Sequence, residues 1–143
     1  MATLNWEGLD ELMEAILHIS KVPDDVLFKA LSEMEDIAAV EIKASGERYH
    51  IRDPESNVHI LDKIKKNKPK RTEDGGTARI SFAGTRQRGR TKTSNGYIAF
   101  VQEYGKRNQV ARPFVSEAMD RNSEKIARAG VKIIADWLDQ EFN

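Results

Sequence analysis

The sequence predicts an α+β fold that forms a single domain over residues 1–143. Apolar residues recur at helical spacing near both ends of the chain, and they alternate with period two between these regions, at Ala78, Ile80 and Phe82. A length of 143 residues with 39% hydrophobic and 32% charged content is typical of one globular domain with its own core. We therefore expect a small antiparallel sheet with a basic hairpin, packed against two N-terminal helices and a long C-terminal helix.

Two amphipathic helices are expected in the N-terminal third. The first covers residues 9–19, where apolar side chains recur at helical spacing and acids lie on the other side. The second begins at Pro23, where a proline loses no hydrogen bond, and the following Asp24 and Asp25 favour the helix dipole. We expect Gly46 to cap this second helix.

A hairpin is expected in the middle of the chain. A turn-rich stretch at residues 53–57 is followed at residues 60–64 by a pattern that predicts a short helical turn leading into a strand. The Asp-Gly-Gly sequence at 74–76 predicts the turn, and the alternation over 77–82 predicts one buried and one wet face. Residues 84–96 contain no apolar residue able to anchor a core, so we expect a mobile basic loop there.

A short helix is expected next, because Tyr97, Phe100, Val101 and Tyr104 fall at i, i+3, i+4 and i+7. Gly105 supplies a left-handed cap at its end.

The last helix is expected to begin at Pro113, to be anchored by Phe114 and to reach nearly to the C-terminus. Gly130 inside it indicates close packing against another element. Glu103 lies near the negative end of the preceding helix, so we expect a cation to hold it, with Arg112 and Lys106 as the candidates.

Several classes of chemistry lack support in the sequence. There is no cysteine, and the three histidines, His18, His50 and His59, lack the spacing of paired metal ligands. Neither a nucleophile elbow nor a phosphate-binding loop occurs. No apolar run reaches the roughly 20 residues of a membrane span, and no signal peptide is recognisable. We expect a soluble, unsecreted protein that is not an enzyme, with no catalytic residues, no cofactor and no metal.

Charge is segregated along the chain although the formal net charge is zero. Residues 1–56 carry a net charge of −8, residues 57–93 carry +8, and residues 94–143 are balanced. This asymmetry suits a partner of opposite sign or a second copy of the chain, and solvated faces explain it equally well. The basic segment has few aromatics beside it, so base stacking is not indicated. The candidate residues for contact with a neighbouring subunit or DNA are Lys63, Lys65, Lys66, Lys68, Arg79, Arg86, Arg88, Arg90 and Lys92.

Two segments of the C-terminal half carry a family pattern. Residues 96–105 read Gly-Tyr-Ile-Ala-Phe-Val-Gln-Glu-Tyr-Gly, and residues 111–115 read Ala-Arg-Pro-Phe-Val before an amphipathic helix. This pattern resembles the tail-completion or minor tail-component (head-tail joining) family of long-tailed double-stranded DNA bacteriophages. The order of helices, turn and charged hairpin also matches that family. The motif residues, to which the resemblance gives structural roles, are Tyr97, Glu103, Tyr104, Gly105, Pro113 and Phe114.

The resemblance implies a structural virion protein, assembled in the cytoplasm of a bacterial host, that completes the tail and joins it to the head. It implies a homo-oligomeric ring, expected to be a hexamer, around the channel through which DNA passes. Its partners would be connector or stopper proteins and tail-tube or tail-terminator proteins, with no membrane. An acidic helical surface meeting a basic hairpin on the next subunit is one way to close the ring.

Two alternatives stay open at this point. The chain could be another neck component, such as a head-tail adaptor or a tail terminator. From a different class, it could be a small non-specific nucleic-acid-binding protein that uses residues 63–92.

Overall fold

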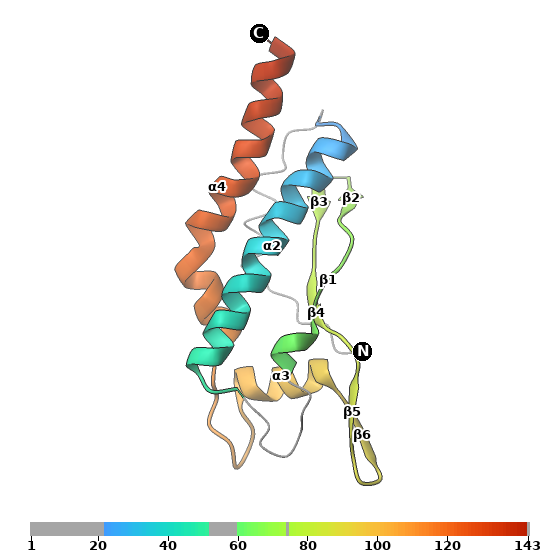
Figure 1. Ribbon diagram of the computed structural model, residues 1–143, viewed down its shortest axis with the longest axis vertical. Coiled ribbons are helices and arrows are strands. Elements are labelled where there is room, and N and C mark those ends of the chain that lie inside the picture. The colour runs from blue at the N-terminus through green and yellow to red at the C-terminus, as the bar shows by residue number, and fades with distance from the viewer. Residues whose placement is uncertain (1–21, 52–59, 74, 143) are drawn as a thin grey trace.

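The computed structural model describes residues 22–51, 60–73 and 75–142. This part of the chain contains two long antiparallel helices, a hairpin that runs along one of them, and a short helix that crosses one end (Figure 1). The expected α+β class is confirmed. The helix expected over residues 9–19 and the turn at 53–57 lie outside the described residues, so one of the two N-terminal helices is in view.

Helices α2 (Asp24–Arg48) and α4 (Phe114–Phe142) pack along each other and make the most extensive contact between elements in the described chain. The helix α2 follows Pro23, whose carbonyl accepts from the backbone N–H of Leu27 at 2.9 Å. Its buried face is a stripe at helical spacing, and α4 supplies the facing stripe. Gly130, expected at a close-packed position of α4, is buried.

The expectation that Gly46 caps α2 is wrong. The helix continues to Arg48, and Gly46 is buried in its last turns against Leu61. A Cβ at position 46 would lie 2.4 Å from Leu61 Cδ2, so the glycine is required by close approach and not by helix termination. The chain turns instead at His50, which has a φ of 57°.

The first hairpin is formed after a 3₁₀ turn η1 (Ile60–Lys63), but Gly75 and Gly76, which were expected in its turn, lie in the strand that follows the turn. Strand β1 (Ile64–Lys66) pairs with β4 (Ile80–Phe82), and β2 (Lys70–Thr72) pairs with β3 (Gly75–Thr77), both antiparallel. Between the two ladders, residues 67–69 face residues 78–79, which is a β-bulge.

The alternation of this hairpin is confirmed with one exception. Ala78, Ile80 and Phe82 are buried and Arg79 is exposed, as predicted. Ser81, expected on the wet face, is also buried, and its hydroxyl accepts a hydrogen bond from the Asn67 side chain at 3.1 Å. The bulge places that asparagine over the serine.

Residues 84–96 were expected to form a mobile loop, and the expectation of a loop is wrong. Strands β5 (Thr85–Arg88) and β6 (Thr91–Ser94) form a second antiparallel hairpin, which projects from the body of the molecule (Figure 1). Its base is fixed by polar contacts: Asn95 is buried, its side chain donates to the Ala83 carbonyl at 2.8 Å, and its backbone N–H donates to the Gly84 carbonyl at 3.0 Å. We had expected this segment to lack an anchor because it lacks apolar residues, but the buried Asn95 anchors the hairpin through hydrogen bonds.

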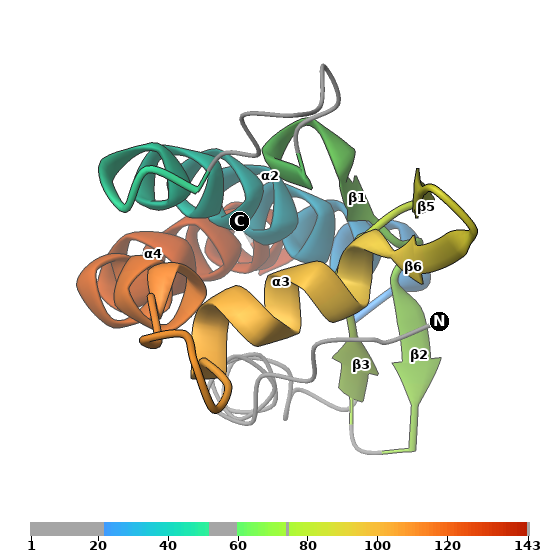
Figure 2. The same cartoon turned by 90° about the horizontal axis from the view of Figure 1, so that it is seen from below.

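Helix α3 (Asn95–Tyr104) ends before Gly105 as predicted, but it begins at Asn95, within the segment that was expected to be a loop. The Ser94 hydroxyl accepts from the Tyr97 backbone N–H at 3.1 Å. Gly105 follows with a φ of 75° and a ψ of 179°, so its φ is positive as glycine permits, but it does not adopt the left-handed helical conformation that was expected of the cap. Figure 2 shows α3 lying across the end of the molecule, between α4 and the second hairpin. Its buried face consists of small or polar residues, including Gly96, Ala99 and Glu103, which lets the helix approach η1, β4 and α4 closely.

Candidate functional site

The aromatic stripe of α3 faces solvent. Tyr97, Phe100 and Tyr104 are 53%, 46% and 57% exposed. The rings of Phe100 and Tyr104 contact each other, with their centroids 4.8 Å apart. Aromatic side chains of this size contribute strongly when a protein partner covers them, and a cluster of them on one helix is typical of an interaction surface. We call these three residues the α3 aromatic face.

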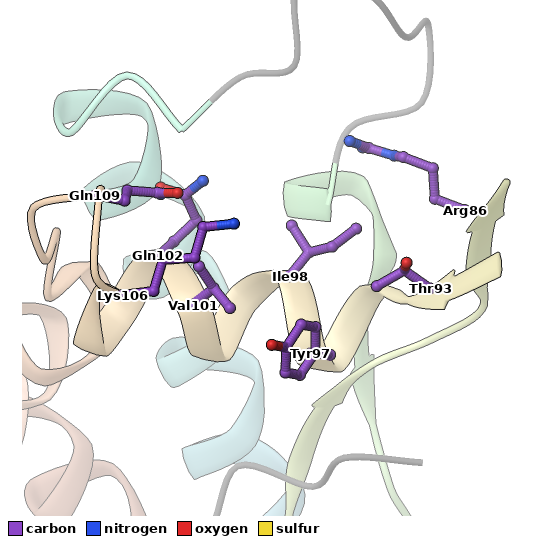
Figure 3. A pocket seen from close by; sticks show the side chains of 8 residues that line it. All are labelled: Arg86, Thr93, Tyr97, Ile98, Val101, Gln102, Lys106 and Gln109. Carbon is purple, nitrogen blue, oxygen red and sulfur yellow. The ribbon is translucent and has the colours of Figure 1, made fainter. Parts of the chain in front are cut away.

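A pocket of about 270 Å³ adjoins this face. It lies between α3, the second hairpin and the tight turn that follows α3, where the backbones of Lys106 and Gln109 bond to each other at 3.0 and 2.9 Å. Figure 3 shows the hairpin residues at one end of the pocket and the turn residues at the other. The described residues that line it are Arg86, Thr93, Tyr97, Ile98, Val101, Gln102, Lys106 and Gln109.

The polar chemistry of this pocket is cationic. Lys106 contributes an exposed positive charge, Arg86 already has an interaction within the chain, and the lining residues that the structure describes include no carboxylate. The side-chain oxygen of Gln102 is buried beneath this lining and accepts no hydrogen bond within the described chain. The pocket therefore suits an acidic, partly apolar partner.

Glu103 lies beneath this surface, and the expectation that Arg112 or Lys106 holds it is wrong. Its side chain is buried and caps the N-terminus of α4. The carboxylate accepts from the backbone N–H of Val115 at 2.9 Å and of Ser116 at 3.1 Å, and also from the Ser116 hydroxyl. The positive end of α4 replaces the expected cation. Arg112 instead donates to the His50 carbonyl at 3.4 Å.

The other motif residues complete the corner between α3 and α4. Gly105 donates its backbone N–H to Val101 O at 2.7 Å, and a Cβ there would lie 2.7 Å from the Gln109 carbonyl. Pro113 is exposed and accepts from Glu117 N in the first turn of α4. Phe114 is fully buried and meets the Phe82 ring edge-on, with centroids 6.0 Å apart, so its predicted anchoring role is confirmed.

The basic residues of the first hairpin lie along α2. Lys66 forms an ion pair with Asp36, and Arg71 forms one with Asp24 and also bonds the Val22 carbonyl. Part of the charge complementarity that we assigned to neighbouring subunits is therefore used within one chain. The remaining candidates from this hairpin are all exposed: Lys63, Lys65, Lys68 and Arg79.

The second hairpin places its basic residues differently. Arg90 and Lys92 are exposed at or near its turn, whereas Arg86 is buried and lines the pocket. Arg88 is in β5 beside the turn. The structure thus brings one predicted contact residue, Arg86, together with one motif residue, Tyr97, and leaves the others spread over two hairpins.

A second polar site was not anticipated from the sequence. Glu35 on α2 is buried, its Oε2 atom has no hydrogen-bond partner in the described chain, and it lines a pocket of about 310 Å³ with Lys66 and Asn67. Burial raises the pKa of Glu35 from 4.5 to about 7; the negative charge of Asp36 adds to this rise and Lys66 opposes it. The sequence could have indicated this site, because Glu35 lies within the apolar stripe of α2, where a carboxylate is unusual.

Two further properties bear on the expected chemistry. Among the described residues, no group of three or more histidines, cysteines or acids is placed to hold a metal ion. In the same part of the chain, no helix combines the length and apolar character that crossing a membrane requires.

Comparison of the chain with models of known protein families, with curated proteins and with solved structures gave no match.

Proposed function

We propose that this chain is a structural subunit of a bacteriophage neck, which completes the tail and joins it to the head as part of a ring around the DNA channel. The observation that carries the proposal is the α3 aromatic face, exposed beside a cationic pocket. Such a surface supplies the aromatic anchors and polar rim of a protein interface.

The positions of the motif residues support this role. Glu103, Gly105 and Phe114 are used to build the corner between α3 and α4, and this corner holds α3 across the end of the molecule. Tyr97 and Tyr104, from the same motif, point to solvent on α3. The motif that resembles the tail-completion family therefore builds and presents a surface, which is what a subunit of an assembly needs.

We also propose that the pocket binds and does not catalyse. General acid–base and covalent catalysis need two or more ionisable or nucleophilic side chains held together around the substrate. The described lining includes no carboxylate and no histidine. Its lysine and its arginine lie at opposite ends of the pocket, and the Tyr97 phenol and the Thr93 hydroxyl lie apart from the lysine (Figure 3).

The proposal is tested by measuring the mass of the purified chain by light scattering during size exclusion, alone and with tail-tube or connector proteins. We expect a monomer or weak association alone, and a ring on the partner. A stable large ring of the isolated chain would contradict the conditional part of this proposal, and the absence of any complex with either partner would contradict the neck assignment.

The nucleic-acid alternative is tested on the same preparation. Binding of duplex DNA by the isolated chain, with a steep dependence on salt that Arg90→Gln with Lys92→Gln reduces, would favour that alternative over a structural role. We expect only weak DNA binding, because Lys66 and Arg71 are already paired with acids of α2.

A further inference from the structure

The partner of the α3 aromatic face can be inferred from the two ends of the molecule. Helix α3, the turn at 106–109 and the second hairpin lie at one end, and α4 runs away from them to the other (Figure 1). With 29 residues, α4 is about 43 Å long, so its C-terminal turns cannot reach α3 of the same chain.

The α3 end carries exposed positive charge. Lys106 and Arg107 follow the aromatic face directly, and Lys92 on β6 adjoins the pocket residue Thr93. Glu103, the acidic residue of α3, is buried, and its carboxylate already accepts hydrogen bonds from the first turn of α4. This end therefore offers aromatic rings bordered by cations.

The far end of α4 has the opposite character. After Lys132 the chain contains no basic residue, whereas Asp136, Asp139 and Glu141 all occur in the last turns and are exposed. Acids at a helix C-terminus add to the negative end of the helix dipole, where cations are normally favoured. Trp137 and Leu138, between the acids, are only partly buried. This end therefore offers exposed acids beside Trp137 and Leu138, which pack against the core, and the last basic residue, Lys132, lies one turn before Asp136.

We propose that the acidic C-terminal turns of α4 of a second copy dock on the α3 aromatic face. Asp136 and Asp139, which lie on one exposed face of α4, would face Lys106 and Arg107 beside the aromatic rings of the other copy. The inference rests on the proposed function, because it names the partner of the same surface.

The contact is heterologous, since each copy uses one end as donor and the other as acceptor. Repetition of such a contact closes into a ring when the rotation between copies permits it. The zero net charge of the chain and its opposite ends fit this arrangement, because like ends repel and unlike ends attract.

Charge reversal at each end tests the inference by sedimentation velocity over a range of concentrations. One variant carries Lys106→Glu with Arg107→Glu, and the other carries Asp136→Lys with Asp139→Lys. We expect each to weaken self-association at least about tenfold relative to the unmodified chain. Arg128→Glu, an exposed reversal in the middle of α4, is the matched control and should leave association unchanged.

Mixing the two variants gives the more decisive result. The first keeps its acidic end and the second keeps its basic end, so these two ends can form the original contact. The two reversed ends are also complementary to each other, so we expect the mixture to regain association as heterodimers and larger species in which the two variants alternate. All four reversals in one chain should restore self-association. A chain that stays monomeric at its highest attainable concentration, association unaffected by the reversals, or a mixture without heterodimer would each overturn the inference.

These outcomes are separate from failure of the proposed function. A chain that self-associates through these ends and yet is dispensable for joining heads to tails would contradict the neck assignment alone. A chain that is required for joining but shows none of the charge dependence would contradict the docking alone.

Discussion

Replacing Glu103 by alanine removes the cap of α4, and its effect can be worked out from the contacts. The carboxylate accepts from two backbone N–H groups of the first turn, those of Val115 and Ser116, and from the Ser116 hydroxyl. Val115 is fully buried, so water does not readily replace the lost acceptor. Glu103 itself is 2% exposed, so the substitution also leaves a cavity.

The expected loss of unfolding free energy is about 3 to 5 kcal/mol for Glu103→Ala. Hydrogen bonds to a charged group contribute about 1.5 to 3 kcal/mol each, and a favourable partly buried charge at a helix end contributes up to about 2 kcal/mol, with incomplete additivity. Glu103→Gln retains one acceptor oxygen and should lose about 1 to 2 kcal/mol. Ser116→Ala, which removes only the hydroxyl donor, should lose about 1 kcal/mol.

Urea unfolding followed by circular dichroism measures these losses. Glu124→Ala is the matched control, because Glu124 is an exposed acid of α4, the helix that Glu103 caps, and its ion pair with Arg128 spans 3.9 Å. Its removal should lower the unfolding free energy by less than about 0.5 kcal/mol. If Glu103→Ala costs no more than Glu124→Ala, the capping role assigned to Glu103 is wrong.

Three other substitutions test separate parts of the structure. Phe114→Ala should cost about 3 to 5 kcal/mol because the ring is fully buried, and an unchanged melting temperature would refute that packing. Gly105→Ala should destabilise the fold far more than Gly89→Ala. Both glycines have a positive φ, but only the Cβ at position 105 would meet backbone atoms, at 2.7 Å from the Gln109 carbonyl oxygen. Equal melting temperatures for the two variants would contradict this explanation. Glu35→Gln tests the buried carboxyl through pH. Because the pKa of Glu35 is about 7 in the folded chain and 4.5 in the unfolded chain, the unmodified chain loses stability as pH rises through this range. The glutamine variant should therefore be more stable than the unmodified chain by about 2 kcal/mol at about pH 8, a value lowered because the adjoining pocket opens to solvent. At about pH 5 the two proteins should have nearly equal stability. If the urea midpoints of the unmodified chain and the glutamine variant differ by the same amount at both pH values, Glu35 does not titrate in this range.

The first hairpin was predictable because its signal is local. Ala78, Ile80 and Phe82 alternate with polar residues just after an Asp-Gly-Gly sequence, and period two is the direct consequence of burying one face of a strand. The second hairpin lacks apolar residues, and its anchor, Asn95, acts through hydrogen bonds to the chain that precedes it. Composition cannot reveal such contacts.

The candidate site was predictable only in part. The stripe of Tyr97, Phe100 and Tyr104 was visible in the sequence, but periodicity alone does not say whether an apolar stripe faces the core or solvent. The opposite face of α3, with Gly96 and Ala99, packs closely because its side chains are small. Glu103 was assigned to a cation from the dipole of its own helix, whereas the dipole that binds it belongs to α4, which only tertiary structure brings there.

Head-to-tail joining is the measurement that tests the neck assignment most directly. Phage particles would be produced with the gene for this chain inactivated, and the purified chain would then be added to the lysate while joined particles are counted by electron microscopy and by infectivity. The account predicts DNA-filled heads and separate tails without the chain, and joined infectious particles after the unmodified chain is added. Joined, infectious particles formed in its absence would contradict the account.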